Sequence, residues 1–171
     1  ADLSGVAIDE AYRRRSRDEL VQHISPALKP FLTELPKVVR HIAGDQNPID
    51  FLLDGEESLS VKSNMREAGK IAPQNIGQPT SSTFWSRLPH LIPKGIDPSL
   101  LVYEDSAKLF KQVAQEKIDT LLTAYWENLF DCDYLIYVCN VLDKNDNLTA
   151  TPTVRLYKKA ESPSWDLSKI T

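Results

Sequence analysis

One run of residues constrains the fold of this chain more than any other feature. Residues 133–142 read DYLIYVCNVL, an almost continuous apolar run rich in β-branched and aromatic side chains. A strand with one face in water alternates apolar and polar residues, whereas a continuous apolar run fits a strand that is covered on both faces. We therefore expect residues 133–142 to form a central strand. The run PTVRLYKK, at 152–159, is expected to be its partner across the turn DKNDNLTA.

The rest of the chain predicts helices on either side of a strand pair. Residues 8–24 contain no Gly or Pro and predict a helix that ends at Ser25-Pro26. The other expected elements are a second helical region at 27–44, interrupted by Pro30 and Pro36, strands at 48–53 and 58–63, a short helix at 82–88 and a long helix at 103–129. This order predicts an α/β fold with a mixed β-sheet flanked by helices.

The length of 171 residues fits a single domain, residues 1–171. The last residues, SWDLSKIT, look like the start of a further element, so we expect the domain to be truncated at its C-terminus. No apolar stretch approaches the roughly 18 residues of a membrane helix, and the first twenty residues lack the apolar core of a signal peptide. We expect a cytoplasmic protein without a membrane partner. Cys132 and Cys139 are expected to be buried free thiols.

The net charge of −4 gives no general support for nucleic-acid binding, although an acidic domain can still carry a local basic cleft. The densest basic cluster is YRRRSR, at 12–17. It predicts either a solvated helix face or a contact with a phosphate backbone.

The stretch NPIDFLLDGEESLSVKSN, at 47–64, predicts two strands around an Asp-Gly turn. Alternation along the second strand sends Ser60 and Lys62 to one face and Leu59 and Val61 to the other, toward a core. Asp50 follows the bend set by Pro48, so the hairpin brings Asp50 and Lys62 close together. A carboxylate that binds a metal ion and a lysine that orients water are the groups that phosphodiester hydrolysis requires.

Pro48-Ile49-Asp50 and Lys62, with eleven residues between Asp50 and Lys62, resemble the P-D…(D/E)-x-K signature of the restriction-endonuclease-like nucleases. The stretch KIAPQNIGQPT, at 70–80, is similar to one that follows the catalytic strand of some type II restriction endonucleases. The resemblance implies an αββαβ core, a magnesium (Mg²⁺) cofactor and cleavage of double-stranded DNA that leaves 5′-phosphates. It also implies a homodimer with one active site for each strand.

The sequence departs from this signature at Ser60, where the commonest form of the family carries Asp or Glu. Some restriction endonucleases of this fold share the Ser-x-Lys arrangement and recruit a carboxylate from elsewhere. Three sources are open here. Glu19 lies on the first helix, Glu57 is expected to point to the face opposite Ser60, and Glu67 lies in the following loop. We favour Glu19.

The resemblance assigns a role to each candidate residue. Asp50, the carbonyl of Val61 and Glu19 would bind Mg²⁺, Lys62 would position the attacking water, and Ser60 would hold water or a phosphate oxygen. Gln78 would lie near the water or the phosphate. The candidate contacts with DNA are Asn64, Arg66, Lys70, Gln74, Arg13 and Arg14. Two alternatives remain open: a junction or repair nuclease of the same fold, and a catalytically inactive relative that binds DNA.

Overall fold

The computed structural model describes residues 2–8, 10–14, 16–44, 47–66 and 82–159. Within these ranges the contacts separate two compact units, one made of residues up to 66 together with 131–159 and the other made of residues 82–130. Each unit is described by itself. The single domain expected from the length stays a prediction.

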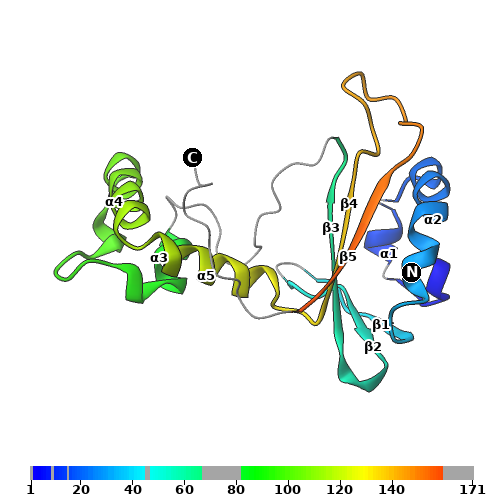
Figure 1. Ribbon diagram of the computed structural model, residues 1–171, viewed down its shortest axis with the longest axis horizontal. Helices are drawn as coiled ribbons and strands as arrows, with labels where there is room; N and C mark the ends of the chain where they lie inside the picture. Colours follow the sequence, from blue (N-terminus) through cyan, green and yellow to red (C-terminus); the bar gives the residue numbers. More distant parts are fainter. Residues whose placement is uncertain (1, 9, 15, 45–46, 67–81, 160–171) are drawn as a thin grey trace. The chain divides into compact units, whose positions relative to one another are not determined.

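The first unit is built on a five-stranded mixed sheet with the strand order β1-β2-β3-β4-β5 (Figure 1). The β3 and β4 strands are parallel, and every other neighbouring pair is antiparallel. The strands are β1 (Val38–His41), β2 (Phe51–Leu53), β3 (Ser58–Asn64), β4 (Tyr134–Cys139) and β5 (Thr153–Lys158). All residues of β4 are buried, which confirms the central, doubly covered strand and its partner β5.

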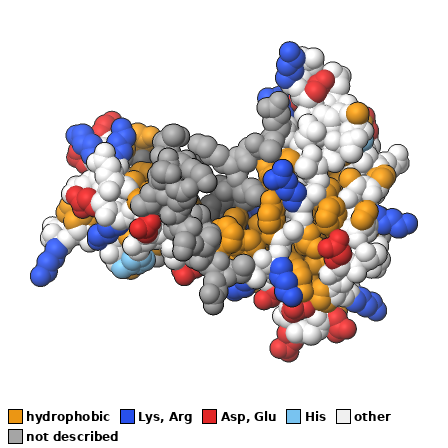
Figure 2. Space-filling model, viewed as in Figure 1, with side chains coloured by type: hydrophobic (Ala, Val, Ile, Leu, Met, Phe, Trp, Pro, Cys, Tyr) orange, Lys and Arg blue, Asp and Glu red, His pale blue; other side chains and the backbone are white. Residues whose placement is uncertain are grey.

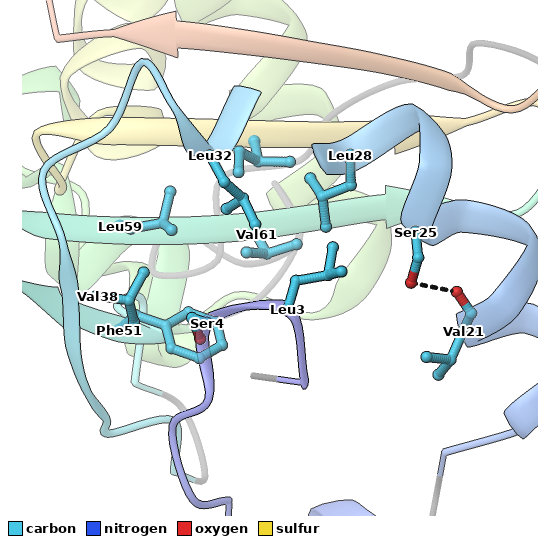
Figure 3. A pocket seen from close by; sticks show the side chains of 11 residues that line it. Leu3, Ser4, Val21, Ser25, Leu28, Leu32, Val38, Phe51, Leu59 and Val61 are labelled. Atoms are coloured by element: carbon cyan, nitrogen blue, oxygen red, sulfur yellow. Dashed lines mark hydrogen bonds between the residues drawn. The ribbon is translucent and has the colours of Figure 1, made fainter. Parts of the chain in front are cut away.

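Helix α2 (Asp18–Leu32) covers one face of this sheet, on the side where the short α1 (Glu10–Arg13) also lies (Figure 1). Leu28 and Leu32 of α2 pack against a core that contains Leu59 and Ile136. A small apolar hollow of about 120 Å³ remains between α2, the 3-10 helix η1 (Asp2–Ser4) and the strands (Figure 3). The face of β3 that carries Leu59 and Val61 is therefore the face under α2, as alternation predicted.

The predicted helix boundaries near the N-terminus are wrong. Pro26 and Pro30 lie inside α2 instead of ending it. An interior proline costs a helix about 3 kcal/mol or more, because it removes a hydrogen bond and crowds the preceding turn. Both prolines are exposed, so their rings do not disturb the apolar side of α2 that packs on the sheet. Partial burial of Leu20, Ile24, Leu28 and Leu32 against the sheet offsets part of this cost.

The second predicted helical region also contains a strand. Residues Val38–His41 form β1 and pair with β2, with a shift in register between Val38 and Arg40. The consecutive valines favour a strand because branching at Cβ restricts their side chains in a helix. Pairing with β2 then makes this short segment a strand instead of part of a helix.

The second unit is helical, with α3 (Ser82–Arg87), α4 (Tyr103–Glu116) and α5 (Ile118–Leu129). Its core contains Phe84, Trp85, Leu91 and Val113. The buried indole N–H of Trp85 donates a 2.9 Å hydrogen bond to Ser106 Oγ. The predicted short helix is confirmed. The predicted long helix is divided at Lys117, whose φ of −137° and ψ of 40° are not helical.

Among the described residues, no helix combines the length and the apolar character that crossing a membrane requires.

Candidate functional site

The candidate site begins at the point where β2 and β3 separate. The β2–β3 connection turns through η2 (Asp54–Glu56), where Gly55 has a φ of 80°, a conformation that glycine adopts without strain. At the other end of the hairpin, the Asp50 N–H donates to the Leu59 carbonyl at 3.0 Å. Pro48 has no N–H to continue the ladder. The two strands therefore diverge beside Asp50.

Where the strands diverge, the Asp50 side chain accepts the hydrogen bond that β3 would otherwise donate to the backbone of β2. Its Oδ2 accepts a 2.6 Å hydrogen bond from the Val61 N–H and a longer one, 3.4 Å, from Ser60 Oγ. Both bonds fall on the same oxygen, and within the described part of the chain no group donates to Oδ1. The carboxylate is thus fixed to β3 through one oxygen while the other stays available.

The carbonyl of Val61 lies on the same edge of β3. The N–H and C=O groups of one residue in an antiparallel strand point to the same neighbour. Because the Val61 N–H points to Asp50, the Val61 carbonyl points to the side of Asp50 as well. A carboxylate oxygen and a backbone carbonyl therefore converge where the hairpin opens.

Ser60 and Lys62 project from the face of β3 opposite α2. Ser60 is 1% exposed, and Lys62 is partly buried. Cys132 lies close to both: burial raises the pKa of its thiol to about 11, against the smaller lowering effects of the Ser60 backbone and the Lys62 charge. The Cys132 thiol therefore stays protonated near neutral pH.

The register extends this face across the sheet to two residues that the sequence analysis missed. Lys62 is paired with Tyr137 of β4, and Tyr137 is paired with Arg155 of β5. Directly paired residues project from the same face. The motif on β3 gives no signal of these residues, since finding them requires the β3–β4 and β4–β5 registers.

The carboxylates proposed to replace the missing acid lie elsewhere or outside the described residues. Glu57 accepts a 3.4 Å hydrogen bond from the Tyr134 hydroxyl, and Tyr134 belongs to the core under α2, so Glu57 lies toward that face as predicted. Glu19 is exposed near the start of α2 and lines a hollow with Met65 and Asp146. The structure does not bring Glu19 together with Ser60 and Lys62, because α2 covers the other face of β3.

Within the described ranges, no three acidic, histidine or cysteine side chains gather as a metal-binding group. Glu67, Lys70, Gln74 and Gln78 lie outside the described residues.

The remaining predicted DNA contacts fall into two groups. Asn64 lies two residues after Lys62 on the same strand face, and its Oδ1 accepts from the Arg66 N–H at 3.4 Å. Arg13 and Arg14 are exposed on and just after α1. Two of the arginines already have carboxylate partners: Arg14 contacts Glu10 at 3.3 Å, and Arg66 contacts Asp146 at 3.0 Å.

Charge is unevenly distributed along the hairpin. Asp54 and Glu56 are exposed at the closed end, where Figure 2 shows acidic side chains gathered at the bottom of the view. Lys62 lies toward the opposite, open end, and no exposed carboxylate follows it on β3. Along this hairpin, a polyanion would therefore meet less repulsion at the open end, where Asp50 and Lys62 lie, than at the closed end.

Comparisons with protein-family models, curated proteins and solved structures give no match to this chain.

Proposed function

We propose that this protein is a Mg²⁺-dependent, site-specific DNA endonuclease of the restriction type, with a restriction-endonuclease-like αββαβ core. The observation that carries the proposal is the open end of the hairpin. There the Asp50 carboxylate is fixed by the Val61 N–H, and Lys62 stands one residue further along β3. The order of elements supports the same core: α2, the β2–β3 hairpin, helices α4 and α5, then β4 parallel to β3.

The donor groups at this point suit a hard divalent cation. Mg²⁺ prefers oxygen ligands, and Asp50 Oδ1 and the Val61 carbonyl are both oxygens on one edge. The described residues supply one carboxylate here, so a second one completes the set. Glu19 is the predicted source, and Glu67, which lies outside the described residues, is an alternative.

Each part of the proposed site would have its own role in hydrolysis. When bound, Mg²⁺ would act as a Lewis acid that lowers the pKa of water and screens the charge on the phosphate. The Lys62 ammonium group would donate hydrogen bonds to the attacking water or to a non-bridging phosphate oxygen. The water oxygen attacks phosphorus, the bond from phosphorus to the 3′ oxygen breaks, and the products are a 3′-hydroxyl and a 5′-phosphate. Cleavage of both strands would be carried out by a homodimer on double-stranded DNA, with one active site for each strand.

Cleavage of supercoiled plasmid DNA with Mg²⁺ tests this function. We expect discrete fragments from the wild type and at least about a hundredfold slower cleavage by Asp50→Asn and Lys62→Ala, because each loses a group that acts on the reacting phosphate. Asp54→Asn and Lys94→Ala make the same chemical changes at exposed positions outside the site and should cleave at the wild-type rate. Thermal melting checks that all four variants fold. Wild-type activity in Asp50→Asn would refute the proposed metal site.

The source of the second carboxylate is a separate question, which Glu19→Gln and Glu67→Gln address in the same assay. The variant that removes a metal ligand should lose activity and require more Mg²⁺ for half-maximal cleavage. If Glu19→Gln matches the wild type at every Mg²⁺ concentration, Glu19 is not a ligand.

One observation favours a second function, DNA binding without cleavage. Ser60 stands where the family signature has an acid, and its hydroxyl donates to Asp50 instead of adding negative charge. An inactive relative would bind duplex DNA with intact affinity and cleave none with any divalent metal. Faster cleavage of branched DNA than of plain duplex would instead indicate a junction or repair nuclease.

A further inference from the structure

Arg155 occupies the end of the row that begins at Lys62. Lys62, Tyr137 and Arg155 are successive partners on three neighbouring strands, so all three project from the face opposite α2. Neighbouring strands are about 4.8 Å apart, which places the Lys62 and Arg155 backbones about 10 Å apart. Tyr137 is 3% exposed, so a buried ring separates two cations.

The surroundings of Arg155 differ from those of Arg14 and Arg66. Tyr157 lies two residues further along the same face of β5, and its proximity raises the pKa of Arg155. Among the described residues no carboxylate pairs with Arg155, whereas Arg14 and Arg66 each have an acidic partner. The side chain is exposed. Arg155 is therefore an exposed cation that no acid among the described residues neutralises.

We propose that Arg155 binds a backbone phosphate of the DNA strand next to the phosphate that Lys62 contacts; this inference rests on the proposed nuclease function. The planar guanidinium group suits a phosphate because it donates two parallel hydrogen bonds. One cation acts at the reacting phosphate, and the second holds the strand in register beside it.

The test compares Arg155→Ala and Arg155→Lys with Lys158→Ala. Lys158 lies on the same strand but on the opposite face, 5.7 Å from the Tyr134 ring, and provides a matched loss of one positive charge. The probe is a fluorescein-labelled 40-base-pair duplex of mixed sequence, with Ca²⁺ in place of Mg²⁺. Fluorescence anisotropy measures Kd over a range of salt concentrations, and plasmid cleavage with Mg²⁺ is measured in parallel.

We expect Arg155→Ala to weaken binding about tenfold, because it removes a charge-assisted contact. The slope of log K against log salt should fall by about 0.9, the value for one phosphate contact. Arg155→Lys should keep the slope and recover part of the affinity, since the charge stays and the paired hydrogen bonds are lost. Lys158→Ala should match the wild type in both.

The other possible outcomes distinguish a failure of the Arg155 contact from a failure of the proposed nuclease function. If Arg155→Ala binds with wild-type affinity and slope while the wild type cleaves plasmid, the inference is overturned and the nuclease function stands. If Lys158→Ala changes the slope as much as Arg155→Ala, the contact is not specific to this face and the inference is also overturned. A wild type that neither binds the duplex nor cleaves plasmid refutes both.

Discussion

One face of β3 is apolar and packs in the core, whereas the other carries polar groups, although their residues alternate along one short strand. Leu59 and Val61 face α2 and contribute to a continuous apolar core. Ser60 and Lys62 face the other way, beside the Cys132 thiol and in register with Leu135 and Tyr137. A strand buried on both faces can therefore hold polar groups rigidly, because the apolar face fixes the backbone from which those groups project. The comparison predicts that substitutions on the two faces affect different measurements.

Leu59→Ala should have the largest effect on stability. Leu59 is 2% exposed in the core under α2, so truncation leaves a cavity and costs about 2–5 kcal/mol of unfolding free energy. Ser60→Ala, at the next position, removes only a 3.4 Å hydrogen bond and should cost less than about 1 kcal/mol. Urea denaturation measures both. Equal losses would contradict the division of tasks between the two faces.

The fold was largely accessible from the sequence where one strong pattern decided the structure. The apolar run 133–142 predicted β4, and Asp-Gly predicted the turn of the β2–β3 hairpin. Prediction failed where tertiary packing overrides local preference. Pro26 and Pro30 end helices in isolation, yet the apolar side of α2 packs on the sheet with both prolines outside that contact.

The candidate site could also be predicted only where local sequence patterns determine it. Alternation alone placed Ser60 and Lys62 on one face, and the bend at Pro48 placed Asp50 beside them. Arg155 was not predicted because its proximity depends on two registers that join residues 75 and 18 positions apart, as in the pairs Lys62–Tyr137 and Tyr137–Arg155. The choice of Glu19, made from its place on a helix, stays a prediction, because sequence position alone does not show which face of the sheet that helix covers.

A hydrogen-bonded clamp at the start of β3 and β4 should make stability depend on pH. The Ser58 N–H and hydroxyl donate to Asp133 Oδ2 at 2.8 and 2.6 Å, and the Ser58 hydroxyl bond is the main cause of the lowered pKa of Asp133. Because the folded pKa lies below the unfolded value, this stabilisation is present above the unfolded pKa. It is lost as the pH falls through the folded pKa.

Ser58→Ala tests this clamp. It should cost about 1 kcal/mol at neutral pH, because the hydroxyl loses its bond to the charged, partly exposed carboxylate and the bond that it accepts from the Asp133 N–H. The difference between the variant and the wild type should shrink as the pH falls below 3.8, the ordinary pKa of the group, and on through the lower folded pKa of Asp133. Urea denaturation across this pH range measures the change. A constant difference between the two proteins at all pH values would assign the effect of Ser58 to packing.

Val61→Ile should have the smallest effect and the opposite sign. Val61 lines the apolar hollow of about 120 Å³ under α2, so one added methyl group has space and should stabilise the protein by up to about 0.8 kcal/mol. Val138→Ile adds the same group at a buried position of β4 that does not line this hollow, and should destabilise by overpacking. Thermal melting compares the two variants, and plasmid cleavage shows whether Val61→Ile leaves activity intact. The Val61 backbone, and not its side chain, holds Asp50. We therefore expect Val61→Ile to be more stable than the wild type and to cleave at the wild-type rate. A loss of cleavage would show that the two faces are coupled through the position of β3.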